Sequence, residues 1–74
     1  MSATQTTTLV VRGMTCNHCV ASVTEELSEV PGVTGVQVDL DAGGDSQVAV
    51  HSEGPLDRAA AEAAVAEAGY SVVA

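Results

Sequence analysis

Two cysteines are the residues best suited to chemistry, and they lie three positions apart. Cys16 and Cys19 stand where a strand-like segment gives way to a helical pattern. Residues three apart on the first turn of a helix share one face, with Cβ atoms about 5–6 Å apart. Two collinear metal–sulfur bonds of roughly 2.3 Å would place the sulfurs about 4–5 Å apart. The positive end of the helix also favours thiolate. The pair therefore predicts a two-coordinate site for a soft cation.

The shortage of further ligands favours copper over zinc. A structural zinc site takes four nitrogen or sulfur ligands, and beyond the cysteines the chain offers only His18 and His51 as nitrogen ligands. We expect His18 to be a solvated residue that points away from the sulfurs, and His51 to lie on a distant strand. Cu(I) accepts two or three thiolates. An open site also admits an incoming thiolate, which predicts transfer by ligand exchange; Zn(II), Cd(II) and Hg(II) stay open as alternative metals.

Hydrophobic spacing predicts six elements around the cysteines. Strands are predicted at residues 6–12, 36–40, 47–51 and 70–73. Helices are predicted from the cysteine loop to Val30 and over residues 56–68. Pro55 suits the first helical position and Gly69 the residue after the second helix, while residues 1–5 are expected to be frayed. The order βαββαβ predicts an α+β, ferredoxin-like fold, in which a four-stranded antiparallel sheet carries both helices on one face.

Length and charge limit the classes of partner. The 74 residues form one domain, and ten acids oppose two arginines for a net charge of −8. Nucleic acids and anionic lipids bind proteins through cationic side chains, which displace the counterions of the phosphates. Because the chain has so few cationic side chains, neither is expected as a partner. No apolar run approaches the ~20 residues that cross a bilayer. The first residues lack the basic and apolar regions of a signal peptide, which predicts a cytoplasmic protein.

Several segments together resemble the heavy-metal-associated domain. They are Gly13-Met14-Thr15-Cys16-Asn17-His18-Cys19, Pro31-Gly32-Val33, the alternating strand at 36–40 and Ala68-Gly69-Tyr70. The resemblance covers roughly residues 7–73 and is greatest to the free-standing copper chaperones of bacteria and archaea. It implies a metal carrier rather than an enzyme. Cys16 and Cys19 would bind Cu(I) and deliver it to the N-terminal metal-binding domain of a copper-transporting P-type ATPase. We expect a monomer without metal, with a metal-bridged homodimer as an alternative for the loaded form.

The resemblance also implies which residues surround the thiolates. Met14 would be buried beneath the loop, and Tyr70 would pack near it. Thr15 favours copper or mercury, because zinc-selective relatives often carry an acidic residue at this position. His18 is expected to influence the thiolates without binding the metal. Many eukaryotic relatives have a lysine in place of Tyr70 and a basic docking face, and this chain has neither.

Two other functions are compatible with the same cysteines. The sequence can represent a detached metal-binding domain of a heavy-metal transporter, which would carry an identical site. It can also represent a thiol–disulfide oxidoreductase, because thioredoxin-like proteins place C-x-x-C at a helix start. Those folds are usually longer and have a cis-proline before a strand, whereas Pro31 follows a helix and Pro55 precedes one.

Acidic residues are concentrated on the two helices. Glu25, Glu26 and Glu29 occupy the C-terminal half of the first helix, and Glu62 and Glu67 lie on the second. The helix dipole disfavours anions near a C-terminus, so these positions need another reason. One interpretation is a solvated face that keeps a small domain soluble. The other is a docking face for a basic partner, since complementary charge steers encounter.

Overall fold

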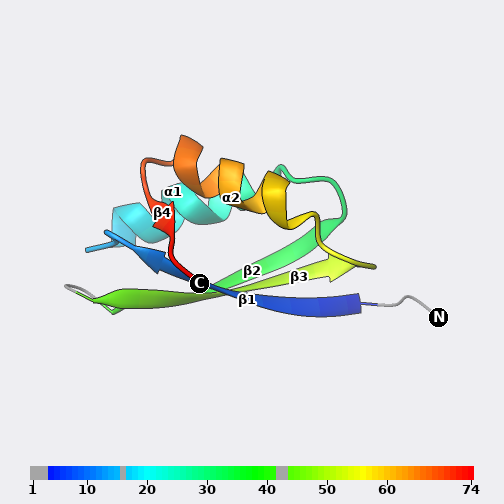
Figure 1. Ribbon diagram of the computed structural model, residues 1–74, viewed down its shortest axis with the longest axis horizontal. Coiled ribbons are helices and arrows are strands. Elements are labelled where there is room, and N and C mark those ends of the chain that lie inside the picture. Colours follow the sequence, from blue (N-terminus) through cyan, green and yellow to red (C-terminus); the bar gives the residue numbers. More distant parts are fainter. Residues whose placement is uncertain (1–3, 16, 42–43) are drawn as a thin grey trace.

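An antiparallel sheet of four strands carries two helices on one face in the computed structural model, which describes residues 4–15, 17–41 and 44–74 (Figure 1). Along the chain the elements are β1 (Thr4–Arg12), α1 (Asn17–Ser28), β2 (Val33–Asp39), β3 (Asp45–Glu53), α2 (Arg58–Glu67) and β4 (Ser71–Val72). Across the sheet the order is β2-β3-β1-β4. The predicted ferredoxin-like arrangement is confirmed.

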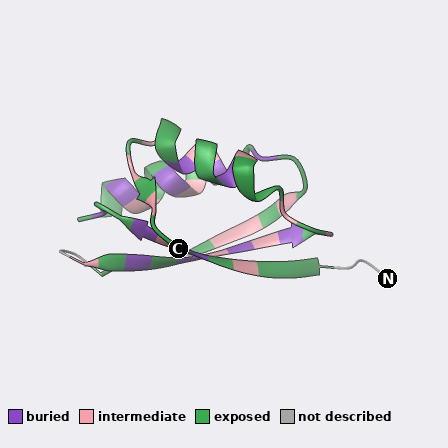
Figure 2. Cartoon of the chain, in the orientation of Figure 1, coloured by how far each residue is buried: buried purple, intermediate pink, exposed green. Residues whose placement is uncertain are grey.

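The core lies between the helices and the sheet and is built from small aliphatic side chains (Figure 2). Alternate strand residues point to the same face, so β1 and β3 each contribute every second residue. The buried cluster consists of Leu9, Val11, Met14, Cys19, Val23, Leu27, Val48, Val50, Ala61 and Val65. Both helices in the described part of the chain are too short or too polar to cross a membrane.

The long central strands extend further than hydrophobic alternation predicts. Thr4 and Gln5 pair with β3, so the expectation of a frayed start is wrong for these two residues, while residues 1–3 lie outside the described ranges. The reason is that β3 continues its inward-facing pattern with Ser46 and Ser52, both buried. Their hydroxyls are satisfied locally: Ser46 Oγ accepts from Asp41 N at 2.9 Å, and Ser52 Oγ donates to a backbone carbonyl at 2.8 Å. Because these inward-facing residues are polar, the alternation of hydrophobic residues does not reveal where the strands end.

The second helix begins three residues after Pro55, so the prediction that Pro55 opens it is wrong. α2 starts at Arg58, and Asp57 is its N-cap. The Asp57 carboxylate accepts a hydrogen bond from the Ala60 amide at 3.2 Å. A capping side chain satisfies one of the amides that have no partner within a helix, and this determines the start of α2 more strongly than the preferred φ of proline.

We predict that Asp57→Ala lowers the free energy of unfolding by about 1 kcal/mol, within the range of about 0.5–2 kcal/mol for loss of an N-cap. Asp57→Asn is the matched control, because it keeps the accepting oxygen and removes only the charge. Urea denaturation followed by far-ultraviolet circular dichroism measures both. Equal losses in the two variants would show that charge, and not capping, is what matters at this position.

Candidate metal centre

Cys19, the second of the two predicted ligands, is the first residue of the buried stripe along helix α1. Cys19 lies on the first turn of α1 and is 9% exposed, so it belongs to the helix and the core rather than to an exposed loop. Cys16 lies outside the described residues. Residues four apart share a helix face, and Cys19 therefore aligns with Val23 and Leu27 in the core. This i, i+4, i+8 spacing was the sequence signal for its burial.

The start of α1 provides an environment that stabilises a thiolate. The first backbone amides of a helix lack intrahelical partners and carry the positive end of its dipole. The first turn of α1 contains no acidic residue that would oppose this effect. In addition, the Thr15 hydroxyl lies 3.8 Å from Cys19 Sγ. Toward a thiolate the hydroxyl is the donor, and hydrogen bonds to an ionised group are among the stronger ones.

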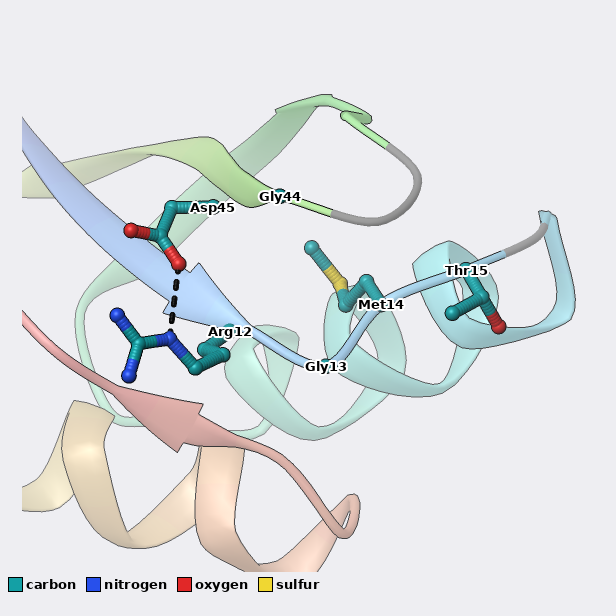
Figure 3. Close-up of a pocket in the computed structure, with 6 residues that line it drawn as sticks. All are labelled: Arg12, Gly13, Met14, Thr15, Gly44 and Asp45. Atoms are coloured by element: carbon teal, nitrogen blue, oxygen red, sulfur yellow. Dashed lines mark hydrogen bonds and ion pairs between the residues drawn. The ribbon is translucent and has the colours of Figure 1, made fainter.

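Met14 anchors the loop from below, as predicted. Its side chain is fully buried and belongs to the same core cluster as Cys19. Met14 and Thr15 point to different sides of the loop, with Met14 directed toward the β2–β3 turn at Gly44 (Figure 3). The Met14 thioether therefore packs in the core, whereas the Thr15 hydroxyl lies beside Cys19 Sγ.

An ion pair closes the sheet next to this loop. Arg12 Nε donates to Asp45 Oδ1 at 3.0 Å, and the two residues face each other where β1 ends and β3 begins. The hydrogen bond and the charge of Asp45 raise the pKa of Arg12. The pair borders an open hollow of about 430 Å³ that Gly13, Met14 and Gly44 also line (Figure 3). Nothing in the local sequence predicted this pair, because only strand register brings the two residues together.

The end of α2 brings Tyr70 to the loop. The Tyr70 amide donates to Val65 O at 3.1 Å and the Gly69 amide to Ala66 O at 2.9 Å, the two hydrogen bonds of a Schellman motif. Gly69 has a φ of +95°, which turns the chain sharply and leaves Tyr70 between α2 and β4 rather than in the predicted strand. A Cβ at Gly13 would lie 3.4 Å from Tyr70 Cδ1. The predicted proximity of the ring to the loop is therefore confirmed.

The two histidines occupy different faces of the molecule. His18 is exposed on α1, as expected. His51 lies on β3, next to the inward-facing Val50, and its Nδ1 is 2.9 Å from Thr6 Oγ1. Its Nε2 is 3.4 Å from Gln37 Oε1. Because side chains alternate along a strand, the sheet separates His51 from Cys19. Within the described ranges, no group of three or more His, Cys, Asp or Glu side chains is placed to hold a metal ion.

Three of the helix carboxylates gather beside one hollow. Glu25, Glu26 and Glu67 line a depression of about 290 Å³ between α1 and α2. Glu62 differs from these three, because its Oε2 accepts from Arg58 Nε at 3.0 Å. Glu67 lies three residues before Tyr70, whereas Glu25 and Glu26 lie about two helical turns beyond Cys19, in the C-terminal half of α1, so the negative charge is gathered between the two helices.

Comparison with known proteins agrees with this geometry. The sequence profile of the family described as "Heavy-metal-associated domain" matches residues 8–71. The chain belongs to the heavy-metal-associated domain family. It is 39% identical over 62 residues to the COP-associated protein of Helicobacter felis, with 84% of this chain and 89% of that protein covered.

Two further matches show where heavy-metal-associated domains occur. A solved structure of a CopZ metallochaperone superposes with a TM-score of 0.79 at 33% identity, covering 93% of this chain and 100% of the other. The copper-transporting ATPase 1 of Rhizobium meliloti is 42% identical over 62 residues, covering 84% of this chain but 7% of the ATPase. The domain therefore occurs both as a small protein and as a minor part of a transporter.

We predict that Gly13→Ala weakens both the fold and metal binding. The φ of +102° at Gly13 disfavours a side chain, which costs about 1–2 kcal/mol of stability, and the new Cβ would lie in contact with the Tyr70 ring. Because the strained segment leads directly to Cys16, we expect Cu(I) affinity to fall about tenfold, as for other residues that orient ligands.

Gly54→Ala is the matched control, because Gly54 has a φ of +76° and open space around its Cβ position. It should lower the free energy of unfolding without changing Cu(I) affinity. Denaturant titration and chelator competition measure the two effects separately. Equal Cu(I) affinities in the two variants would contradict a role for the contact between Gly13 and Tyr70.

Proposed function

We propose that this protein is a copper chaperone that binds Cu(I) through Cys16 and Cys19 and passes it to a partner by exchange of thiolate ligands. The observation that carries the proposal is the position of Cys19 on the first turn of α1, beside the Thr15 hydroxyl and above the buried Met14. The similarity to a CopZ metallochaperone and to a domain of a copper-transporting ATPase supports the same assignment.

The donor chemistry explains why Cu(I) is the preferred cargo. Two thiolates satisfy a soft monovalent cation, whereas a closed zinc site requires four ligands. Exchange begins when a thiolate of the partner forms a third sulfur–copper bond. One cysteine of this chain then leaves the metal, and a second thiolate of the partner replaces the other cysteine. The copper keeps its oxidation state throughout, so no electron donor or acceptor is needed.

We predict that Cys16→Ser and Cys19→Ser each reduce Cu(I) affinity by at least about 100-fold, because a hydroxyl is a poor ligand for a soft cation. Reduced protein is titrated anaerobically with Cu(I) against a competing chelator, and Zn(II) is titrated in parallel. His51→Ala serves as the control, because the sheet separates His51 from Cys19, and it should bind Cu(I) as the wild type does. Cysteine-independent binding, or tighter binding of Zn(II) than of Cu(I), would rule out the proposed cargo site.

We further propose that the partner is the N-terminal metal-binding domain of a copper-transporting P-type ATPase. The match to a small part of the Rhizobium ATPase supports this, because the transporter contains a domain of the same family. The carboxylates Glu25, Glu26 and Glu67 gather beside the hollow between α1 and α2, and none of them forms an ion pair within the described residues. They are suited to steering a partner domain with a basic surface toward this face of the helices.

We predict that the double variant Glu25→Gln/Glu26→Gln transfers Cu(I) to such a domain severalfold more slowly at low ionic strength. Exposed charges are screened over about 10 Å at 0.1 M salt, so the wild-type rate should fall as salt is added and approach that of the variant. Stopped-flow measurement of transfer provides the rates.

Asp39→Asn/Glu53→Gln is the matched control, because it removes two exposed charges from β2 and β3, away from the hollow. It should transfer copper at nearly the wild-type rate. If the wild type and the Glu25→Gln/Glu26→Gln variant show the same rate at every salt concentration, the carboxylates serve solubility and not docking.

The match to one domain of the ATPase also supports a second candidate function. In this alternative, the sequence works as a metal-binding domain within a longer transporter and receives copper instead of carrying it. An immunoblot of native cells separates the two candidates. A band near 7.4 kDa supports the chaperone, and a band many times larger supports the transporter domain.

A further inference from the structure

Arg12 is the last residue of β1 and the last residue in the sheet before the loop that leads to Cys16. It faces Asp45 in the final pair between β1 and β3, and Ser71 in the final pair between β1 and β4. The next residue, Gly13, has a φ of +102°, and there the chain turns away from the sheet. The direction in which the loop leaves the sheet is therefore set next to Arg12. We call Gly13–Thr15 the loop base.

Asp45, the partner of Arg12, stands on a segment that hydrogen bonds hold in place. Its neighbour Ser46 is fully buried, and Ser46 Oγ accepts a hydrogen bond from the Asp41 amide at 2.9 Å. On the other side, the Gly44 amide donates to Asp41 O at 3.0 Å. Asp45 therefore offers a fixed acceptor to Arg12, whose side chain is 67% exposed and would otherwise be free to change rotamer.

The loop base borders open space on the side of this ion pair. It lines the hollow of about 430 Å³ that Arg12, Asp45 and Gly44 complete (Figure 3). Because side chains do not fill this hollow, packing does not fix the loop base from that direction. The buried side chain of Met14 holds the loop base to the core, and the bond of 3.0 Å between Arg12 Nε and Asp45 Oδ1 holds the strand end from which it starts.

We propose that Arg12 and Asp45 are positioning residues for the cysteine site, because their ion pair holds the loop base in the arrangement in which Cys16 and Cys19 bind Cu(I). The inference rests on the proposed function, since it concerns the same two ligands. Neither Arg12 nor Asp45 contacts the metal in this proposal. A loop that is already ordered loses less conformational entropy when it binds, so loss of the ion pair should weaken Cu(I) binding.

The second arginine of the chain forms a similar ion pair that cannot have this effect. Arg58 Nε lies 3.0 Å from Glu62 Oε2, and both ion pairs are exposed to solvent. Arg58 and Glu62 are four residues apart on α2, whereas Arg12 and Asp45 are 33 residues apart in the sequence. A pair on one helix stabilises that helix. The pair between β1 and β3 instead joins the strand that leads into the loop base to the β2–β3 turn.

Positioning and long-range electrostatics predict opposite effects on Cu(I) binding. Replacement of Arg12 by glutamine makes a chain with a net charge of −8 more negative by one unit. Additional negative charge attracts a cation, so the change of charge alone would tighten Cu(I) binding. Loss of a positioning contact would weaken it. Replacement of Arg58 by glutamine causes the same change of net charge and leaves the strand ends intact.

The first experiment compares Arg12→Gln with Arg58→Gln in the full chain. Reduced protein is titrated anaerobically with Cu(I) against a competing chelator, and dissociation is followed by stopped flow in excess chelator. We expect Arg12→Gln to bind Cu(I) about two- to fivefold more weakly, the range that an exposed ion pair supports, because dissociation is faster. Arg58→Gln should bind at least as tightly as the wild type. Circular dichroism verifies that both variants are folded.

The possible outcomes separate this inference from the proposed function. Arg12→Gln binding Cu(I) as tightly as the wild type or more tightly, or equal weakening in Arg12→Gln and Arg58→Gln, would overturn the positioning role alone. Weak or cysteine-independent binding by the wild type itself would overturn the proposed function, and the positioning role with it.

A double-mutant cycle tests whether Arg12 and Asp45 act together. Asp45→Asn should also weaken Cu(I) binding, and Arg12→Gln/Asp45→Asn should bind no more weakly than the weaker of the two single variants, because the same contact is lost only once. If the two residues acted only through their opposite charges, their effects on affinity would instead have opposite signs and cancel in the double variant. That result would overturn the proposal.

Amide hydrogen exchange gives a readout that overall stability does not determine. In the metal-free protein, NMR should show faster exchange at Gly13 and Met14 in Arg12→Gln than in Arg58→Gln, because local opening of the loop base does not require unfolding of the domain. Amides in the middle of α2 should show no acceleration in Arg12→Gln relative to the wild type. Equal exchange rates at Gly13 and Met14 in the two variants would contradict the positioning role.

Discussion

The structure depends on the connection between its surface loop and its small core. Met14 and Cys19 lie on either side of Cys16 in the chain, and both side chains belong to the buried cluster. Ordering a surface loop costs conformational entropy, about 1–2 kcal/mol per residue for the backbone. Burial of residues on both sides of the loop offsets that cost through the hydrophobic effect. Met14 and Cys19 therefore fix the loop to a core of valines and alanines from both sides.

The need to fix this loop to the core also explains where α1 begins and how α2 ends. α1 begins where Cys19 can take the first position of the buried stripe, and α2 ends in a Schellman motif that directs Tyr70 back toward Gly13. Gly13 and Gly69 both have positive φ values, which place the loop and the aromatic ring close together. Two segments that are far apart in the sequence thus form one surface around the proposed metal ligands.

Periodicity along the chain was sufficient to predict the order of elements, because the alternation of Val48 and Val50 or the helical spacing of Val23 and Leu27 reflects burial directly. It failed where polar residues occupy inward positions, as Ser46 and Ser52 do in β3. The burial of Cys19 was not predicted, because the cysteine was considered only as a ligand and not as a member of the helix stripe. The Arg12–Asp45 pair depends on the register between β1 and β3. The Gly13–Tyr70 contact depends on how the chain turns back after α2. Neither can be inferred from residues that are neighbours in the sequence.

The distribution of charge limits the kind of partner that the chain can approach. Both arginines are already paired with carboxylates, Arg12 with Asp45 and Arg58 with Glu62, so they do not neutralise the glutamates beside the hollow between α1 and α2. Negative charge accumulates there and favours a basic partner.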